Sequence, residues 1–155
     1  EKFPSYAAGN QPFDLQNALT PTEVYPQLAS WTESAHQLYH AFTLIDYAFP
    51  FFAGLFIAAT AAFAMRVSLP TWYAALTRRN LLPVFMFGTA FDWLENIAAL
   101  GVISLYPTEL RGLPIVLVLA KQLKLVCVLS AQAVTLLLLL YAAGNWLTAR
   151  LRLRR

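Results

Sequence analysis

The stretch GTAFDWLENIAALGV, residues 88–102, decides the fold because it combines a membrane-like composition with charge. Most of its residues suit a helix that crosses a bilayer, yet Asp92 and Glu95 lie near its middle. A charge at bilayer depth costs at least about 2.5–3.5 kcal/mol on insertion scales, so such residues are rare and face protein rather than lipid. The stretch therefore predicts a helix whose polar face packs against other helices.

A second apolar segment, residues 115–147, carries the opposite charges, Lys121 and Lys124. At 100° per residue, the polar residues of each segment fall on a single helix face. Two acids then balance two bases, and the sequence predicts a neutral ionic cluster between the two helices. The predicted members of this cluster are Asp92, Glu95, Asn96, Lys121, Lys124 and Gln132.

The depth of the charges can be counted along the two predicted helices. Glu95 lies ten residues before Leu105, and Lys124 lies ten residues after Pro114. At 1.5 Å per residue, both are about 15 Å from the outer ends of their helices, so antiparallel packing would pair them. We interpret the cluster as a structural pin for helix register; a proton relay, a ligand pocket and a catalytic acid–base site are the alternatives.

Composition places the chain among integral membrane proteins. Of its 155 residues 59% are hydrophobic and only 12% are charged, against roughly 25% charged in a soluble domain. Because about 20 apolar residues cross a bilayer, the sequence predicts an all-α bundle with three spans. The spans are expected at about 46–66, 81–106 and 115–147, after an irregular outer-side arm with an interfacial amphipathic helix over residues 1–45.

The distribution of charge predicts the orientation. The net charge is +3, and seven bases gather on one predicted side without an acid among them. The other side holds five acids and only two bases: Glu1, Asp14, Glu23, Glu33 and Glu109, with Lys2 and Arg111. This asymmetry predicts an outside N-terminus and an inside C-terminus, in a bacterial inner membrane or an organellar inner membrane. It does not resemble a nucleic-acid surface. The clustered bases are Arg66, Arg78 and Arg79 in a loop, and Arg150, Arg152, Arg154 and Arg155 in the C-terminal tail.

The pair His36 and His40 is a second candidate site. Its i, i+4 spacing puts both imidazoles on one helix face, as metal or tetrapyrrole ligands require, and Asp46 could add an oxygen ligand. Hydrogen bonding at the membrane surface is the alternative, with Asp46 as the N-cap of the first span. Trp31 and Tyr39 are expected at the membrane interface. No catalytic residue and no metal site is assigned.

Two short motifs resemble a pattern in a group of small polytopic membrane proteins. Asp46-Tyr-Ala-Phe-Pro50 opens a predicted span, and Asp92-Trp-Leu-Glu95-Asn96 lies inside the next, which gives a D-x-x-x-P … D-x-x-E-N pattern. The resemblance covers about residues 13–130, implies a further preceding helix and brings no activity with it.

These observations favour a non-catalytic accessory subunit of a larger membrane complex, of an energy-transducing kind (respiratory or photosynthetic, with a role in electron transport). The chain is small and has no glycine-rich phosphate loop, GxSxG or HExxH motif. The alternative is a lipid- or isoprenoid-handling enzyme or carrier that uses the ionic cluster. We expect membrane lipids and partner subunits as binding partners, with bound lipid and no resident cofactor.

Overall fold

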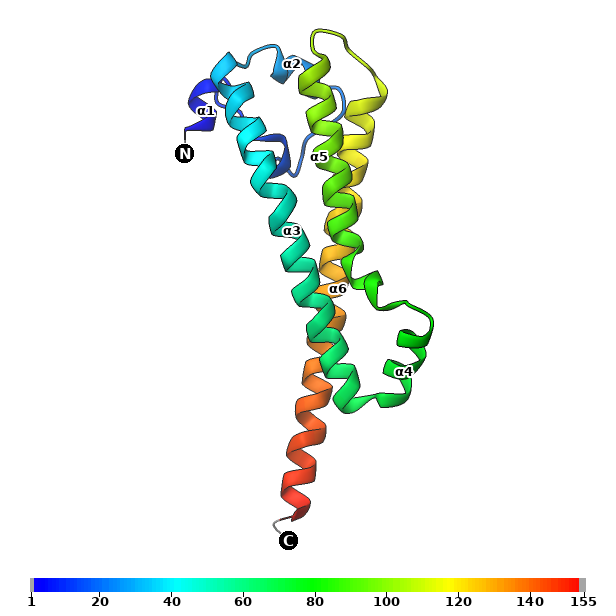
Figure 1. The fold of residues 1–155 in the computed structure, drawn as a ribbon. Helices are drawn as coiled ribbons and strands as arrows, with labels where there is room; N and C mark the ends of the chain where they lie inside the picture. The colour runs from blue at the N-terminus through cyan, green and yellow to red at the C-terminus, as the bar shows by residue number, and fades with distance from the viewer. Residues whose placement is uncertain (1, 154–155) are drawn as a thin grey trace. The chain divides into compact units, whose positions relative to one another are not determined.

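The computed structural model describes residues 2–153, and all regular structure in that range is helical (Figure 1). The all-α prediction is therefore confirmed for the described residues. Arg154 and Arg155 of the predicted basic tail lie outside them. The N-terminal arm contains α1 (Phe3–Tyr6), η1 (Phe13–Leu15) and α2 (Val24–Leu28). It is followed by α3 (Glu33–Ser68), α4 (Pro70–Arg78), η2 (Leu82–Met86), α5 (Phe87–Leu105) and α6 (Gly112–Leu153).

The chain forms two compact units. Unit 1 contains the residues up to Pro50 together with Thr89–Lys124, and so holds the arm, the start of α3, nearly all of α5 and the start of α6. Unit 2 contains Phe51–Gly88 and the residues from Leu125 onward. The described bases of the predicted inner side, Arg66, Arg78, Arg79, Arg150 and Arg152, all belong to unit 2.

Two helices, not the predicted three, are long and apolar enough to cross a membrane. They are α3 and the Gly112–Arg152 part of α6, with 36 and 41 residues. Only 22% and 11% of their most apolar windows are buried within the protein, unlike the core helix of a water-soluble fold. The predicted span at 81–106 is wrong in this respect because its 19-residue helix, α5, contains two carboxylates and an amide that lower its apolar character.

Helix α3 begins at Glu33, thirteen residues before the predicted start of the first span at Asp46. The Thr32 hydroxyl, 3.4 Å from the Ala35 amide nitrogen, accepts a hydrogen bond at this helix start. Asp46 is therefore not an N-cap, and Pro50 lies in the helix interior. A proline there has no N–H to donate to the Asp46 carbonyl oxygen four residues earlier. Side chains of α5 supply donors nearby: Trp93 Nε1 to Tyr47 O at 2.9 Å and Thr89 Oγ1 to Pro50 O at 2.8 Å.

An aromatic core in unit 1 fixes the arm on α3. Phe13 stacks on Trp31 with ring centroids 4.7 Å apart, and Tyr39 lies 5.5 Å from the Trp31 ring. Phe3 meets Trp31 edge-on at 5.0 Å. Trp31 and Tyr39 are buried, so their rings pack against protein; their position at a membrane interface stays a prediction. The arm packs on Tyr39 of α3 and on Trp31 just before that helix, and such aromatic pairs add about 0.5–1.5 kcal/mol beyond area burial.

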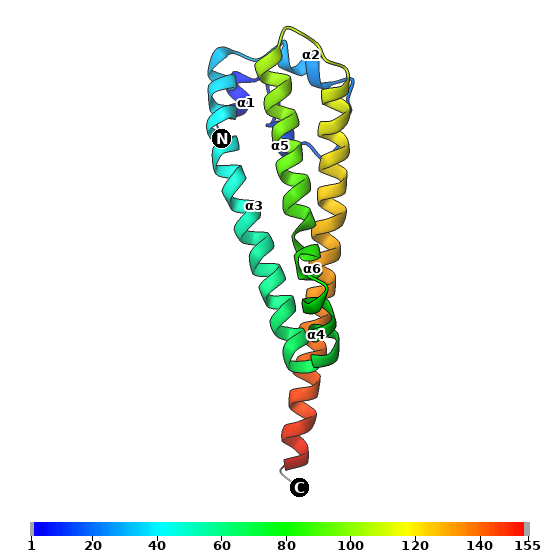
Figure 2. The same ribbon diagram turned by 45° about the vertical axis from the view of Figure 1, so that its right-hand side comes forward.

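Helix α5 runs antiparallel to both of its neighbours in unit 1, as both views show (Figure 2). Gly101 lies beside Leu113 at the start of α6, and Glu95 lies beside Lys121 further along. The contacts with α3 also show an antiparallel arrangement. Thr89, earlier in α5, contacts Pro50, and Asn96, later in α5, contacts Asp46, which comes before Pro50 in α3. The polar face of α5 is thus enclosed by protein from two sides.

Candidate functional site

Lys124 of α6 holds three carboxylates at once. Its Nζ lies 2.5 Å from Asp14 Oδ1, 2.7 Å from Asp92 Oδ1 and 2.7 Å from Glu95 Oε2. The two acids of α5 are spaced i, i+3 and therefore share a helix face, and η1 brings in the third. The side chains of these four residues are 2–14% exposed, which strengthens each charge interaction relative to water.

Lys121 extends this network to the backbone of the arm. Its Nζ donates to the carbonyl oxygens of Phe13 and, at 2.9 Å, of Gln16, and lies 3.7 Å from Glu95 Oε1. The side chain is 4% exposed. Both lysines of α6 therefore bind the N-terminal arm as well as α5.

Asp46 of α3 closes the network on the other side of α5. Its Oδ2 accepts a hydrogen bond of 2.9 Å from Asn96 Nδ2. One oxygen each from Asp14, Asp46 and Asp92 lie within 4.8 Å of one another. We call these three residues with Glu95, Asn96, Lys121 and Lys124 the arm–helix cluster.

The arm–helix cluster is not neutral, which corrects the predicted balance. Four carboxylates face two ammonium groups, a formal excess of two negative charges. The prediction counted only the acids within the apolar segment of α5. The folded arm adds Asp14, and the longer α3 brings Asp46 alongside Asn96.

A buried oxygen of the cluster lacks a hydrogen-bond donor. Asp92 Oδ2 is buried and accepts no hydrogen bond from any residue in the range 2–153. The Glu95 oxygens are also buried, but Lys124 Nζ lies 2.7 Å from Oε2 and Lys121 Nζ lies 3.7 Å from Oε1. A buried polar atom without a partner is costly, and in a native structure it calls for a physical explanation.

Three of the predicted site residues do not join the cluster. Gln132 lies eight residues beyond Lys124 on α6, in unit 2, with an exposed side chain. His40 is exposed, and His36 is half-buried with its ring edge-on to Trp31 at 5.9 Å. Asp46, the proposed third ligand of the histidine pair, bonds to Asn96 instead. Among the described residues, only Asp14, Asp46 and Asp92 form a group of three or more potential metal ligands.

Sequence reasoning missed the contribution of the arm. Asp14 was assigned only to the outer-side charge, and the carbonyls of Phe13 and Gln16 carry no side-chain signal. One clue was available. Lys121 lies one helical turn nearer the start of the predicted helix than Lys124, and therefore nearer the residues that precede the first span.

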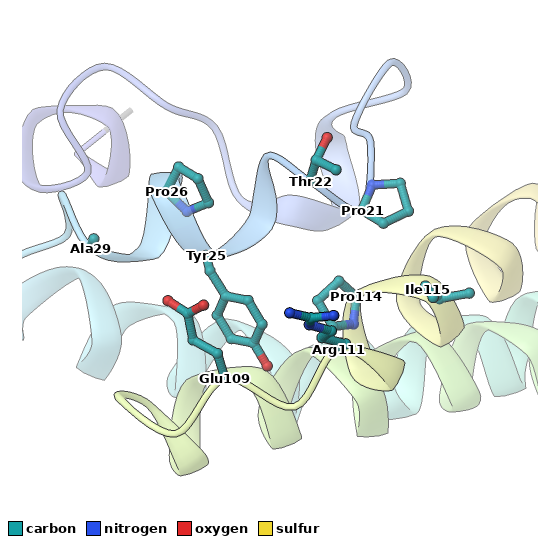
Figure 3. A pocket seen from close by; sticks show the side chains of 9 residues that line it. All are labelled: Pro21, Thr22, Tyr25, Pro26, Ala29, Glu109, Arg111, Pro114 and Ile115. Atoms are coloured by element: carbon teal, nitrogen blue, oxygen red, sulfur yellow. The ribbon is translucent and has the colours of Figure 1, made fainter.

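A cavity in unit 1 lies away from the cluster (Figure 3). It has a volume of about 500 Å³ and lies between the arm and the α5–α6 turn. Prolines and the Tyr25 ring line it, and the exposed Glu109 and Arg111 flank that ring without an ion pair to any described residue.

Glu23 precedes α2. Hydrogen bonds from the Thr20 hydroxyl and amide lower the pKa of the Glu23 carboxyl and keep it ionised at neutral pH.

The Tyr25 hydroxyl ties the arm to this turn by donating to Leu110 O at 3.1 Å. We expect Tyr25→Phe to lower the free energy of unfolding by about 0.5–1.5 kcal/mol, the net contribution of a typical hydrogen bond. Amide exchange at residues 106–111 should rise at the same time. Denaturant unfolding and hydrogen exchange in detergent measure both effects. Tyr6→Phe is the matched control, because the Tyr6 hydroxyl bonds to nothing in residues 2–153; equal effects of the two changes would contradict the prediction.

Compared with protein-family models, curated proteins and solved structures, the chain shows no match. The fold and site by themselves define an all-helical protein with two helices able to cross a membrane and a buried ionic cluster that fixes its N-terminal arm.

Proposed function

We propose that this chain is an integral membrane protein and a non-catalytic accessory subunit of a larger membrane complex. One observation carries the proposal: Lys121 and Lys124 of α6 both bind the arm, through Asp14 and through the Phe13 and Gln16 carbonyls. The two lysine charges, which are unfavourable to bury, thus hold an extramembrane segment in one conformation. Such a segment suits a fixed surface for a partner protein.

The apolar surface supports a membrane location. Large side chains on α3 and α6 are exposed, among them Phe49, Phe56 and Leu129 at 63–72%. Extensive apolar surface is rare on a soluble monomer and marks contact with lipid or with other proteins. The low burial of the two apolar helices points the same way.

The partner contact belongs at the cavity beside Tyr25. Glu109 and Arg111 are exposed there and have no ion pair within the described chain. Arginine and tyrosine are also the residue types most often found at the energetic centres of protein interfaces. The energy-transducing kind of complex remains a prediction from the sequence.

The alternative, a lipid- or isoprenoid-handling enzyme or carrier, requires a substrate to reach the cluster. In the structure the three carboxylates around Lys124 are already paired with it, and the arm covers them on one side. The 500 Å³ cavity is lined by other residues. The geometry therefore favours a structural use of the cluster.

The test is purification of the tagged full chain in mild detergent, followed by native sizing and mass measurement. We expect a stoichiometric complex with other membrane subunits, and we expect Arg111→Ala to weaken it. Asn17→Ala, an exposed change on the arm outside the cavity, is the control and should leave the complex intact. A monomer or homodimer that holds a lipid would overturn the proposal and favour the carrier alternative.

A further inference from the structure

We infer that Asp14, Asp46 and Asp92 bind a hard divalent cation of the calcium class. The three residues come from three separate elements, η1, α3 and α5, so the site exists only in the folded unit 1. One carboxylate oxygen of each lies within 4.8 Å of the other two. Opposite ligands of Ca²⁺, at 2.3–2.6 Å from the ion, lie about 4.6–5.2 Å apart, so the trio has the dimensions of such a site.

Each of the three carboxylates has one oxygen that is not used by the protein. Lys124 engages Oδ1 of Asp14 and Oδ1 of Asp92, and Asn96 engages Oδ2 of Asp46. Within residues 2–153 no hydrogen bond uses the remaining oxygens. Each carboxylate of the trio therefore keeps one oxygen without a hydrogen bond while the network around Lys124 stays in place.

A separate observation points to a ligand. Asp92 is 5% exposed, and its Oδ2 is buried without a hydrogen-bond donor. Lys124 contacts the other oxygen of this carboxylate, Oδ1, at 2.7 Å. A cation at the trio would satisfy this oxygen.

The charge of the site selects the kind of ion. The arm–helix cluster carries a formal excess of two negative charges, which one divalent ion neutralises. The available donors are all oxygens, which favour Ca²⁺, Mg²⁺ and Mn²⁺ over the softer metals that need thiolate or imidazole. Asp14 and Asp46 are only half-buried, so two of the three ligands are partly accessible.

The probe is Ca²⁺ itself, added to the full chain in detergent at constant pH after treatment with a chelator. We expect a saturable rise in Tm. We also expect bound Tb³⁺ to show luminescence sensitised by the tryptophans, and Ca²⁺ to abolish this signal by displacing the Tb³⁺. Asp46→Asn should weaken both by about tenfold or more, since it removes one ligand charge. Glu23→Gln removes an exposed acid of the arm outside the trio and should change neither.

Each other result overturns the inference. If Ca²⁺ at millimolar concentration leaves the Tm of the unaltered chain unchanged, no site of this kind exists, whatever the variants do. If Tm instead rises on acidification without any effect of Ca²⁺, protons neutralise the excess charge. If Asp46→Asn and Glu23→Gln respond to Ca²⁺ like the unaltered chain, the ion binds adventitiously elsewhere.

Discussion

Lys124→Met is expected to lower the free energy of unfolding by about 3–5 kcal/mol, the cost of removing one partner from a buried ion pair. Methionine matches the length of lysine but leaves Asp14, Asp92 and Glu95 without the ammonium that they share. The cluster would then hold four carboxylates and one base. Unfolding in detergent with increasing denaturant, followed by tryptophan fluorescence, measures the loss.

Replacing one of the acids should lower the free energy of unfolding less than replacing Lys124, which they surround. Glu95→Gln removes one carboxylate, reduces the negative excess and leaves Lys124 with two partners, so we expect a smaller loss than for Lys124→Met. Adding Glu95→Gln to Lys124→Met should recover part of the stability. Lys2→Met, on an exposed residue of the arm, is the control. The structural role of the cluster fails if Lys124→Met is as stable as this control.

Gly88→Ala is expected to cost about 1–3 kcal/mol in unit 2 through overpacking. A Cβ at this position would lie 2.5 Å from Val128 Cγ2 and 3.4 Å from the Val128 backbone nitrogen. Valine is stiff at χ1, so its methyl cannot rotate away without a change of rotamer. The helix backbone must shift instead. The same unfolding measurement gives the size of the effect.

Two further variants separate this contact from a general effect of alanine in a helix. Combining Gly88→Ala with Val128→Ala should restore most of the stability, because the offending methyl is gone. Gly144→Ala, on α6 with nothing within 4 Å of the added carbon, should be neutral or stabilising by up to about 1 kcal/mol. If Gly88→Ala behaves like Gly144→Ala, the close approach at Val128 is not a constraint.

The helices and their shared polar faces could be predicted because they depend on periodicity. The apolar residues recur at helical spacing, and the count along each helix placed Glu95 and Lys124 at one level. The structure brings these two side chains to 2.7 Å. Boundaries were harder to predict. Asp46 and Pro50 resemble a helix start, but α3 begins at Glu33 because the earlier Thr32 hydroxyl caps it.

The arm could not be predicted because its contacts follow no period. Short helices and turns bring Phe13 onto Trp31 and Asp14 onto Lys124, across more than 100 residues of chain in the second case. Backbone carbonyls provide the acceptors for Lys121, and any residue type carries a carbonyl.

The sequence by itself determined an all-helical chain of membrane-like composition with acids on one helix and bases on the next, since helix period and charge are local properties. Only the tertiary structure decided the charge of the cluster. The charge of a buried cluster depends on which residues are close in space, not on which are close along the chain. The fold brings Asp14 and Asp46 to the two acids and two bases that balance in the sequence. The resulting excess of two negative charges is the physical reason to seek a cation at the trio.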